Sequence, residues 1–111
     1  MSQPWPPPPD LHSIQELVAT ADVEAFIADG APADEYETEA DLLFNQLENF
    51  TTAELVPEKI LPILEDIWAR NFTMPAGELL KRRPALLALA QQISRFFGPE
   101  ARPQVRGSEA S

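Results

Sequence analysis

Five carboxylates fall within the twelve-residue stretch DGAPADEYETEA, which runs from Asp29 to Ala40 and contains no basic residue. Acidic side chains at this density could bind a divalent cation, act as general acids or bases, or attract a basic partner. A calcium loop places its first acidic ligands before its glycine, whereas Gly30 precedes four of these five acids. The choice among the other chemistries depends on the element that carries the acids.

A helix is predicted over residues 34–50, with Asp34 as its N-cap and Glu37 as the partner three residues later. Its apolar residues recur at helical spacing, and the first of them is the expected inward anchor: Tyr36, Ala40, Leu43, Leu47 and Phe50. The acids are divided around the solvated side and form the candidate surface for a protein partner: Asp34, Glu35, Glu37, Glu39 and Asp41. Acids in a first turn also favour the helix dipole, which is the simplest interpretation of the stretch.

The sequence offers little else for catalysis or metal binding. It contains no cysteine, which excludes disulfides, thiolate chemistry and Cys-based zinc sites. His12 is the only histidine, and it stands beside Ser13 at the expected start of a helix, where adjacent side chains do not face each other. We therefore expect no catalytic residue, no metal site and no cofactor.

Charge is distributed very unevenly along the chain, whose formal net charge is −10. Residues 1–58 contain thirteen acids and no Lys or Arg, whereas residues 59–111 contain five acids and eight bases. An anionic surface repels nucleic-acid phosphates and anionic lipids, so neither nucleic acid nor a membrane is an expected partner. A partner that binds through charge is expected to be a basic protein.

Lys81, Arg82 and Arg83 form the one basic cluster of the sequence. We expect them to pair with the acidic half, within the chain or between copies, because three bases without interleaved aromatic residues are weak support for nucleic-acid binding. Several aromatic residues stand at helical spacing and are predicted to belong to the core: Trp68, Phe72, Phe96 and Phe97.

The chain of 111 residues is expected to form one helical domain over residues 10–98. A proline-rich extended arm is predicted at residues 1–9, and a flexible tail at 99–111. The first helix is predicted over residues 10–28, with a break near Thr20 and a left-handed glycine cap at Gly30.

The second half is also predicted to be helical. Thr51 and Glu54 have capping-box spacing and begin a third element, which prolines kink before it ends near Asn71. Residues 73–78 are read as a connection, and Pro84 is expected in the first turn of the last helix, which ends at Gly98. The predicted fold is all-α, a compact bundle of four to five short amphipathic helices. Neither a signal peptide nor a run of about 20 apolar residues is present, so a soluble cytoplasmic protein is expected.

The stretches GAPADEYETEADLLFNQL and TTAELVPEKILPILEDIWARNF resemble a family of small bacterial helical proteins, a domain of unknown function. In that family a Gly/Ala-Pro turn leads into D-E-Y-D/E and an amphipathic helix, and the next helix carries a late aromatic pair, here Trp68 and Phe72. The resemblance covers residues 29–72, but EAFIADG stands where the family has an aromatic-Asp-Pro segment. It implies a compact helical fold and no reaction.

The leading hypothesis is a non-catalytic protein-binding module that presents an acidic helical surface to a basic protein. A cationic toxin is one such partner, since the chain is similar to immunity-type proteins in size and acidity. Two alternatives stay open at this point. One is a small metal-binding or enzymatic domain that uses the same carboxylates. The other is a self-associating structural module in which the acidic and basic halves of two copies face each other.

Overall fold

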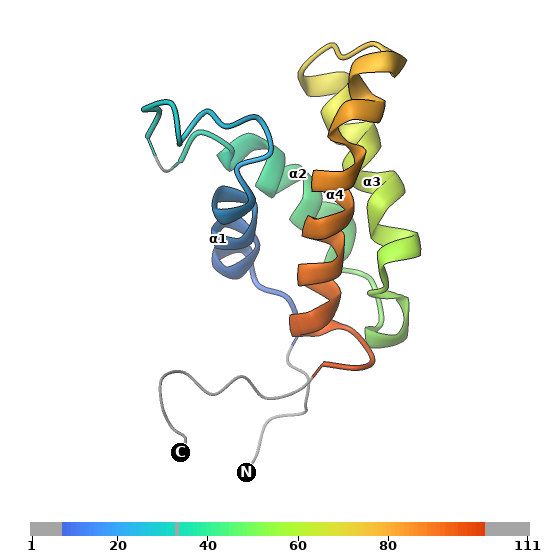
Figure 1. Ribbon diagram of the computed structural model, residues 1–111. Helices are drawn as coiled ribbons and strands as arrows, with labels where there is room; N and C mark the ends of the chain where they lie inside the picture. Colours follow the sequence, from blue (N-terminus) through green and yellow to red (C-terminus); the bar gives the residue numbers. More distant parts are fainter. Residues whose placement is uncertain (1–7, 33, 102–111) are drawn as a thin grey trace, which may run out of the picture.

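Four α-helices and one short 3-10 helix make up the computed structural model, which describes residues 8–32 and 34–101. In chain order they are α1 (Leu11–Ala21), α2 (Glu37–Leu47), η1 (Thr52–Glu54), α3 (Pro57–Asn71) and α4 (Ala76–Phe97) (Figure 1). Since no strand occurs within the described ranges, the predicted all-α bundle is confirmed. Residues 1–7 of the predicted arm and 102–111 of the predicted tail lie outside the described residues.

The helices α3 and α4 lie side by side as a helical hairpin, and α1 and α2 complete the bundle (Figure 1). The helix α1 packs against α2 and α4, and α2 packs against α3. Trp68 of α3 is fully buried in the centre of one continuous core. Of the four aromatic residues predicted for the core, Trp68 and Phe97 are buried, and Phe72 and Phe96 are partly buried and pack against it.

The first helix ends at Ala21, which confirms the predicted break near Thr20. The predicted continuation to residue 28 is wrong, because residues 22–30 form a series of turns. Asp22 has a left-handed conformation (φ 44°), and its carboxylate accepts the N–H groups of Ile27 and Ala28 at 3.1 and 2.9 Å. A side chain that accepts backbone hydrogen bonds in this way competes with helix formation. Gly30 has the expected positive φ (111°), but it closes these turns.

The second helix is shorter than predicted at both ends, since it begins at Glu37 and stops at Leu47. Asp34 is not its N-cap. The N-cap is Tyr36, whose side chain makes no capping bond. The carbonyl of Asp34 instead accepts the N–H of Glu37 at 3.0 Å, which makes a tight turn ahead of the helix. At the other end, the backbone N–H of Phe50 donates a hydrogen bond to the carbonyl of Leu47, which forms a turn after the helix.

The start of the third element follows the sequence pattern. Thr51 and Glu54 form the predicted capping box, in which the backbone N–H of Thr51 donates to Glu54 Oε1 at 2.8 Å. This box begins the 3-10 turn, and α3 then starts at Pro57, where a missing N–H costs nothing. The predicted end of the helix at Asn71 is confirmed.

The last helix begins eight residues earlier than predicted, at Ala76, so Pro84 lies inside α4. An interior proline costs about 3 kcal/mol in an isolated helix. That cost is offset by tertiary packing, because α4 buries a long apolar face: Leu86, Leu89, Ala90, Ile93 and Phe97. The segment predicted as a connection, residues 73–78, is therefore partly helical, and Lys81–Arg83 lie within α4.

Gly98 follows α4 and leaves no room for a side chain, although its φ of −86° suits any residue. A Cβ atom there would overlap the carbonyl oxygen of Leu55 and lie 2.7 Å from that of Ser94. Both are backbone atoms and cannot move aside cheaply. We expect Gly98→Ala to lower the free energy of unfolding by about 2 kcal/mol, as overpacking does. Urea denaturation of this variant beside Gly77→Ala, where a Cβ meets nothing within 4 Å, checks this, and equal stability of the two variants would contradict it.

Candidate functional site

The five acids of the candidate surface do not share one environment. Asp34, Glu35, Glu37 and Asp41 are exposed, as expected. Glu39 is buried, with 8 % of its surface accessible, so its inclusion in the exposed surface is wrong. We call the remaining four residues the acidic surface: Asp34, Glu35, Glu37 and Asp41.

Glu39 is buried because it shares a helix face with the anchor residues of α2. It stands three residues after Tyr36 and four before Leu43, both of which are buried, and these spacings place side chains on one side of a helix. That side packs against α3, where Asn71 Nδ2 donates a hydrogen bond to Glu39 Oε2 at 3.0 Å. The carboxylate therefore serves the α2–α3 contact.

No Lys or Arg side chain of the described residues neutralises the acidic surface. Within the described part of the chain, Lys and Arg side chains pair with Glu24, Glu65, Asp66 and Glu78. None of them pairs with a residue of the acidic surface. A polar contact reaches it from α1, where Gln15 Nε2 donates to Asp41 Oδ1 at 3.3 Å.

The basic cluster pairs within the chain. Arg82 Nε donates to both oxygens of Glu24, at 3.0 and 2.9 Å, which confirms the predicted pairing with the acidic half. Lys81 and Arg83 instead pair with acids of the second half, Glu78 at 3.2 Å and Glu65 at 3.3 Å. Arg82 and Arg83 thus connect α4 to the α1–α2 connection and to α3, whereas the pair of Lys81 with Glu78 lies within α4.

Tyr36 anchors the start of α2 to the turns that follow α1. It is 2 % exposed, and its hydroxyl donates to Asp22 Oδ1 at 2.7 Å and accepts the backbone N–H of Glu24 at 2.9 Å. Burial, together with the bond to Asp22, raises the pKa of Tyr36 to about 12. The bond from Tyr36 in turn lowers the pKa of Asp22, aided by the N–H groups of Ala28 and Ile27. Both groups are held in the protonation states that preserve this contact at neutral pH.

Glu24 is the buried acid that the sequence did not single out. Only 7 % of its side chain is exposed, and besides Arg82 it accepts the indole N–H of Trp68 at 2.9 Å. Glu24, Trp68 and Arg82 thus join the α1–α2 connection to α3 and α4. Nothing in the local sequence distinguishes Glu24 from the other twelve acids of residues 1–58.

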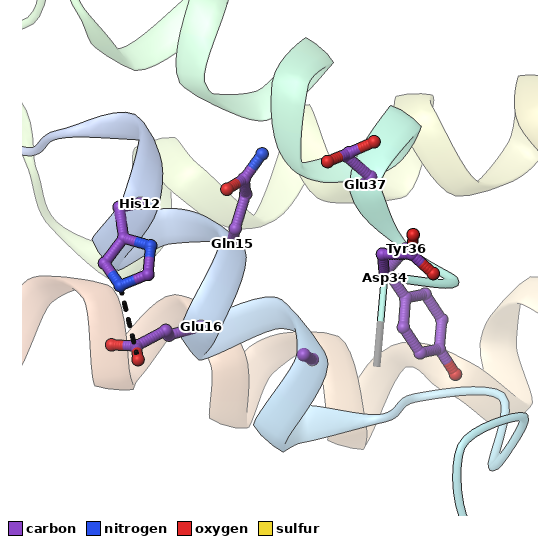
Figure 2. A pocket seen from close by; sticks show the side chains of 7 residues that line it. His12, Gln15, Glu16, Asp34, Tyr36 and Glu37 are labelled. Carbon is purple, nitrogen blue, oxygen red and sulfur yellow. Dashed lines mark ion pairs between the residues drawn. The ribbon is translucent and has the colours of Figure 1, made fainter. Parts of the chain in front are cut away.

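A groove separates α1 from the segment that leads into α2. It has a volume of about 230 Å³, and its lining residues are His12, Gln15, Glu16, Ala19, Asp34, Tyr36 and Glu37. Figure 2 shows the residues of α1 on one side and those of residues 34–37 on the other. The acidic surface therefore continues into a hollow.

The single histidine has no catalytic arrangement with its neighbour. The side chain of His12 is exposed and lies 3.5 Å from Glu16 Oε2, whereas the hydroxyl of Ser13 donates to Asp10 at 2.8 Å. His12 thus sits in the first turn of a helix, as predicted. Among residues 8–32 and 34–101, no three His, Asp or Glu side chains come close enough together to hold a metal ion.

Fold and site together define an all-α helical bundle whose acidic surface has no ion pair with a Lys or Arg of the described residues and lies beside a groove. Comparisons of the chain with protein-family models, curated proteins and solved structures give no match. The resemblance of residues 29–72 to a bacterial family therefore stays a prediction. In the part of the chain that the structure describes, no helix has the length and apolar character to span a membrane.

Proposed function

We propose that this chain is a non-catalytic binding protein whose acidic surface docks a basic protein partner. The observation that supports it is the placement of the ion pairs. The paired bases of the described residues are used by Glu24, Glu65, Asp66 and Glu78, which leaves the exposed acids at the start of α2 without a countercharge. Uncompensated charge of one sign, gathered on one surface, attracts a partner of the opposite sign and repels the wrong one.

The acids would act mainly on the rate of association. Exposed carboxylates gain little affinity from a single contact in water, because solvent and salt screen them. Their summed field raises the association rate with a cationic protein by a factor of about 10 to 1,000, and salt removes this effect. A cationic toxin neutralised by an immunity-type protein, or a nucleic-acid-binding protein held by its basic face, fits this chemistry.

Two variants with the same change in net charge test the proposal. In the first, the acidic surface is neutralised as Asp34→Asn, Glu35→Gln, Glu37→Gln and Asp41→Asn. In the second, four exposed acids elsewhere are neutralised as Asp29→Asn, Glu48→Gln, Glu58→Gln and Glu100→Gln. Each immobilised protein is exposed to cell lysate at about 0.02 M salt and then washed at about 0.5 M, where screening is much stronger. The proteins released by the wash are identified by mass spectrometry.

The native chain and the second variant are expected to retain the same basic protein, and the first variant to lose it. The purified partner should then associate at least about 10-fold more slowly with the first variant than with the second. If both variants retain the partner equally, total charge and not this surface is responsible, and the proposal fails. It fails as well if the native chain retains no basic protein.

A further inference from the structure

The groove between α1 and residues 34–37 has an apolar wall and an acidic rim. Ala19 and the buried Tyr36 form part of the wall, and most of the lining surface is apolar. Glu16 stands on the α1 side, and Asp34 and Glu37 stand on the opposite side (Figure 2). All three acids are exposed. Hydrocarbon and negative charge are therefore presented together, in one hollow.

Two of the three rim carboxylates have no ionic partner among the described residues. In the described ranges, neither Asp34 nor Glu37 forms an ion pair, and Glu16 is near only His12, at 3.5 Å. Among the described residues, the carboxylates of Asp34 and Glu37 at the mouth of the groove are thus without a countercharge.

An arginine side chain matches both properties of the groove. Its three methylene groups can lie along apolar surface while the charged end stays at the rim. The guanidinium group is weakly hydrated and carries five N–H donors in a plane, so it can bind carboxylates on two sides at once. A lysine ammonium is a compact and strongly hydrated charge, and an apolar side chain would leave the carboxylates without a partner.

We propose that this groove receives an arginine side chain of the basic protein partner. The inference rests on the proposed function and names the part of the acidic surface that distinguishes arginine from lysine. The acidic surface attracts any cationic protein at long range, and the groove selects among them at contact.

Two short peptides serve as probes, one alternating glycine with arginine and the other glycine with lysine at equal length and charge. Their affinities are measured by isothermal titration calorimetry at low salt. The native chain is expected to prefer the arginine peptide by roughly 5-fold, the ratio that corresponds to about 1 kcal/mol of added contact. Ala19→Leu fills the groove without a change of charge. In this variant the arginine and lysine peptides should bind with about equal affinity. Ala88→Leu, the same substitution at an exposed site of α4, should leave it intact.

Glu37→Gln provides a second variant in case Ala19→Leu disturbs α1, and Glu48→Gln, outside the groove, is its control. Far-UV circular dichroism establishes that each variant is folded. If the two peptides bind equally to the native chain, or if the arginine preference survives both Ala19→Leu and Glu37→Gln, the inference is overturned while the proposed function stands. A loss of preference in the controls also overturns it. If neither peptide binds, the proposed function fails as well.

Discussion

Replacing Glu24 by alanine is expected to lower the free energy of unfolding by about 3 kcal/mol, although this acid has no role in the proposed surface. Its carboxylate accepts the indole N–H of Trp68, a residue that is fully buried. A buried donor left without an acceptor costs about 1–3 kcal/mol. The variant also removes both bonds from Arg82 and the packing of the Glu24 stem. Urea denaturation followed by far-UV circular dichroism measures the change.

The control for this prediction is Glu78→Ala. Glu78 is the second acid near Arg82, at 3.9 Å, but its side chain is 46 % exposed, so its loss should cost less than about 1 kcal/mol. A double-mutant cycle of Glu24→Ala with Trp68→Phe isolates the indole bond, and a coupling of about 1–2 kcal/mol is expected. Equal costs for Glu24→Ala and Glu78→Ala, or a coupling near zero, would show that the buried bond does not stabilise the fold.

Replacing Tyr36 by alanine should have the largest effect, a loss of about 4 kcal/mol, which is typical of a buried aromatic ring cut back to a methyl group. The ring stacks between Phe26 and Trp68, with centroid distances of 5.8 and 6.2 Å. Small domains are stable by only about 5–15 kcal/mol, so the variant should be close to unfolding. Urea denaturation measures this loss directly.

Tyr36→Phe separates the hydroxyl from the ring. It keeps the stacking but removes the bonds to Asp22 and to the N–H of Glu24, and a cost of about 1–3 kcal/mol is expected. Hydrogen exchange should quicken at the amides of Ile27 and Ala28, because Asp22 is then held less firmly. If the phenylalanine variant is as unstable as the alanine variant, the ring contributes little. If its exchange is unchanged, the hydroxyl does not hold these turns.

Both stability predictions bear on the proposed binding function, because the same contacts position the acidic surface. Tyr36 immediately precedes α2 and lines the groove, and its hydroxyl fixes the chain that leads from α1 to residues 34–37. Asp34 and Glu37 flank it and stand at the rim. A rigid anchor beneath exposed acids keeps a binding site in shape before the partner arrives, which lowers the entropy cost of docking.

The sequence by itself determined the helical class of the fold and several of its boundaries. The capping box of Thr51 and Glu54, the break after Thr20 and the stop at Gly98 all depend on residues close together in the chain. Local patterns of this kind can be read without the fold, because the atoms that satisfy each other are neighbours. The inward position of Tyr36 followed in the same way, from the spacing of the apolar residues of α2.

Local patterns failed where a distant contact outweighed a local preference. Proline lacks a backbone N–H, so Pro84 favours the first turn of a helix. It nevertheless lies inside α4, because the apolar face that follows it is buried against the bundle. Glu39 is an acid of the kind usually found on the surface, yet it is buried, and Asn71 of α3 donates a hydrogen bond to its carboxylate. In both cases the energy gained by packing exceeds the cost that the local rule describes.

Only the tertiary structure decided which charges remain available for binding. The sequence shows that the first half is acidic and that Lys81–Arg83 are basic, but it does not say which pairs form. Arg82 reaches Glu24 across 58 positions of the chain, and Trp68 reaches it across 44. A buried carboxylate must find donors wherever packing places them, so its partners depend on the whole fold. The acids Asp34, Glu35, Glu37 and Asp41 are exposed, and they pair with no Lys or Arg of the described residues.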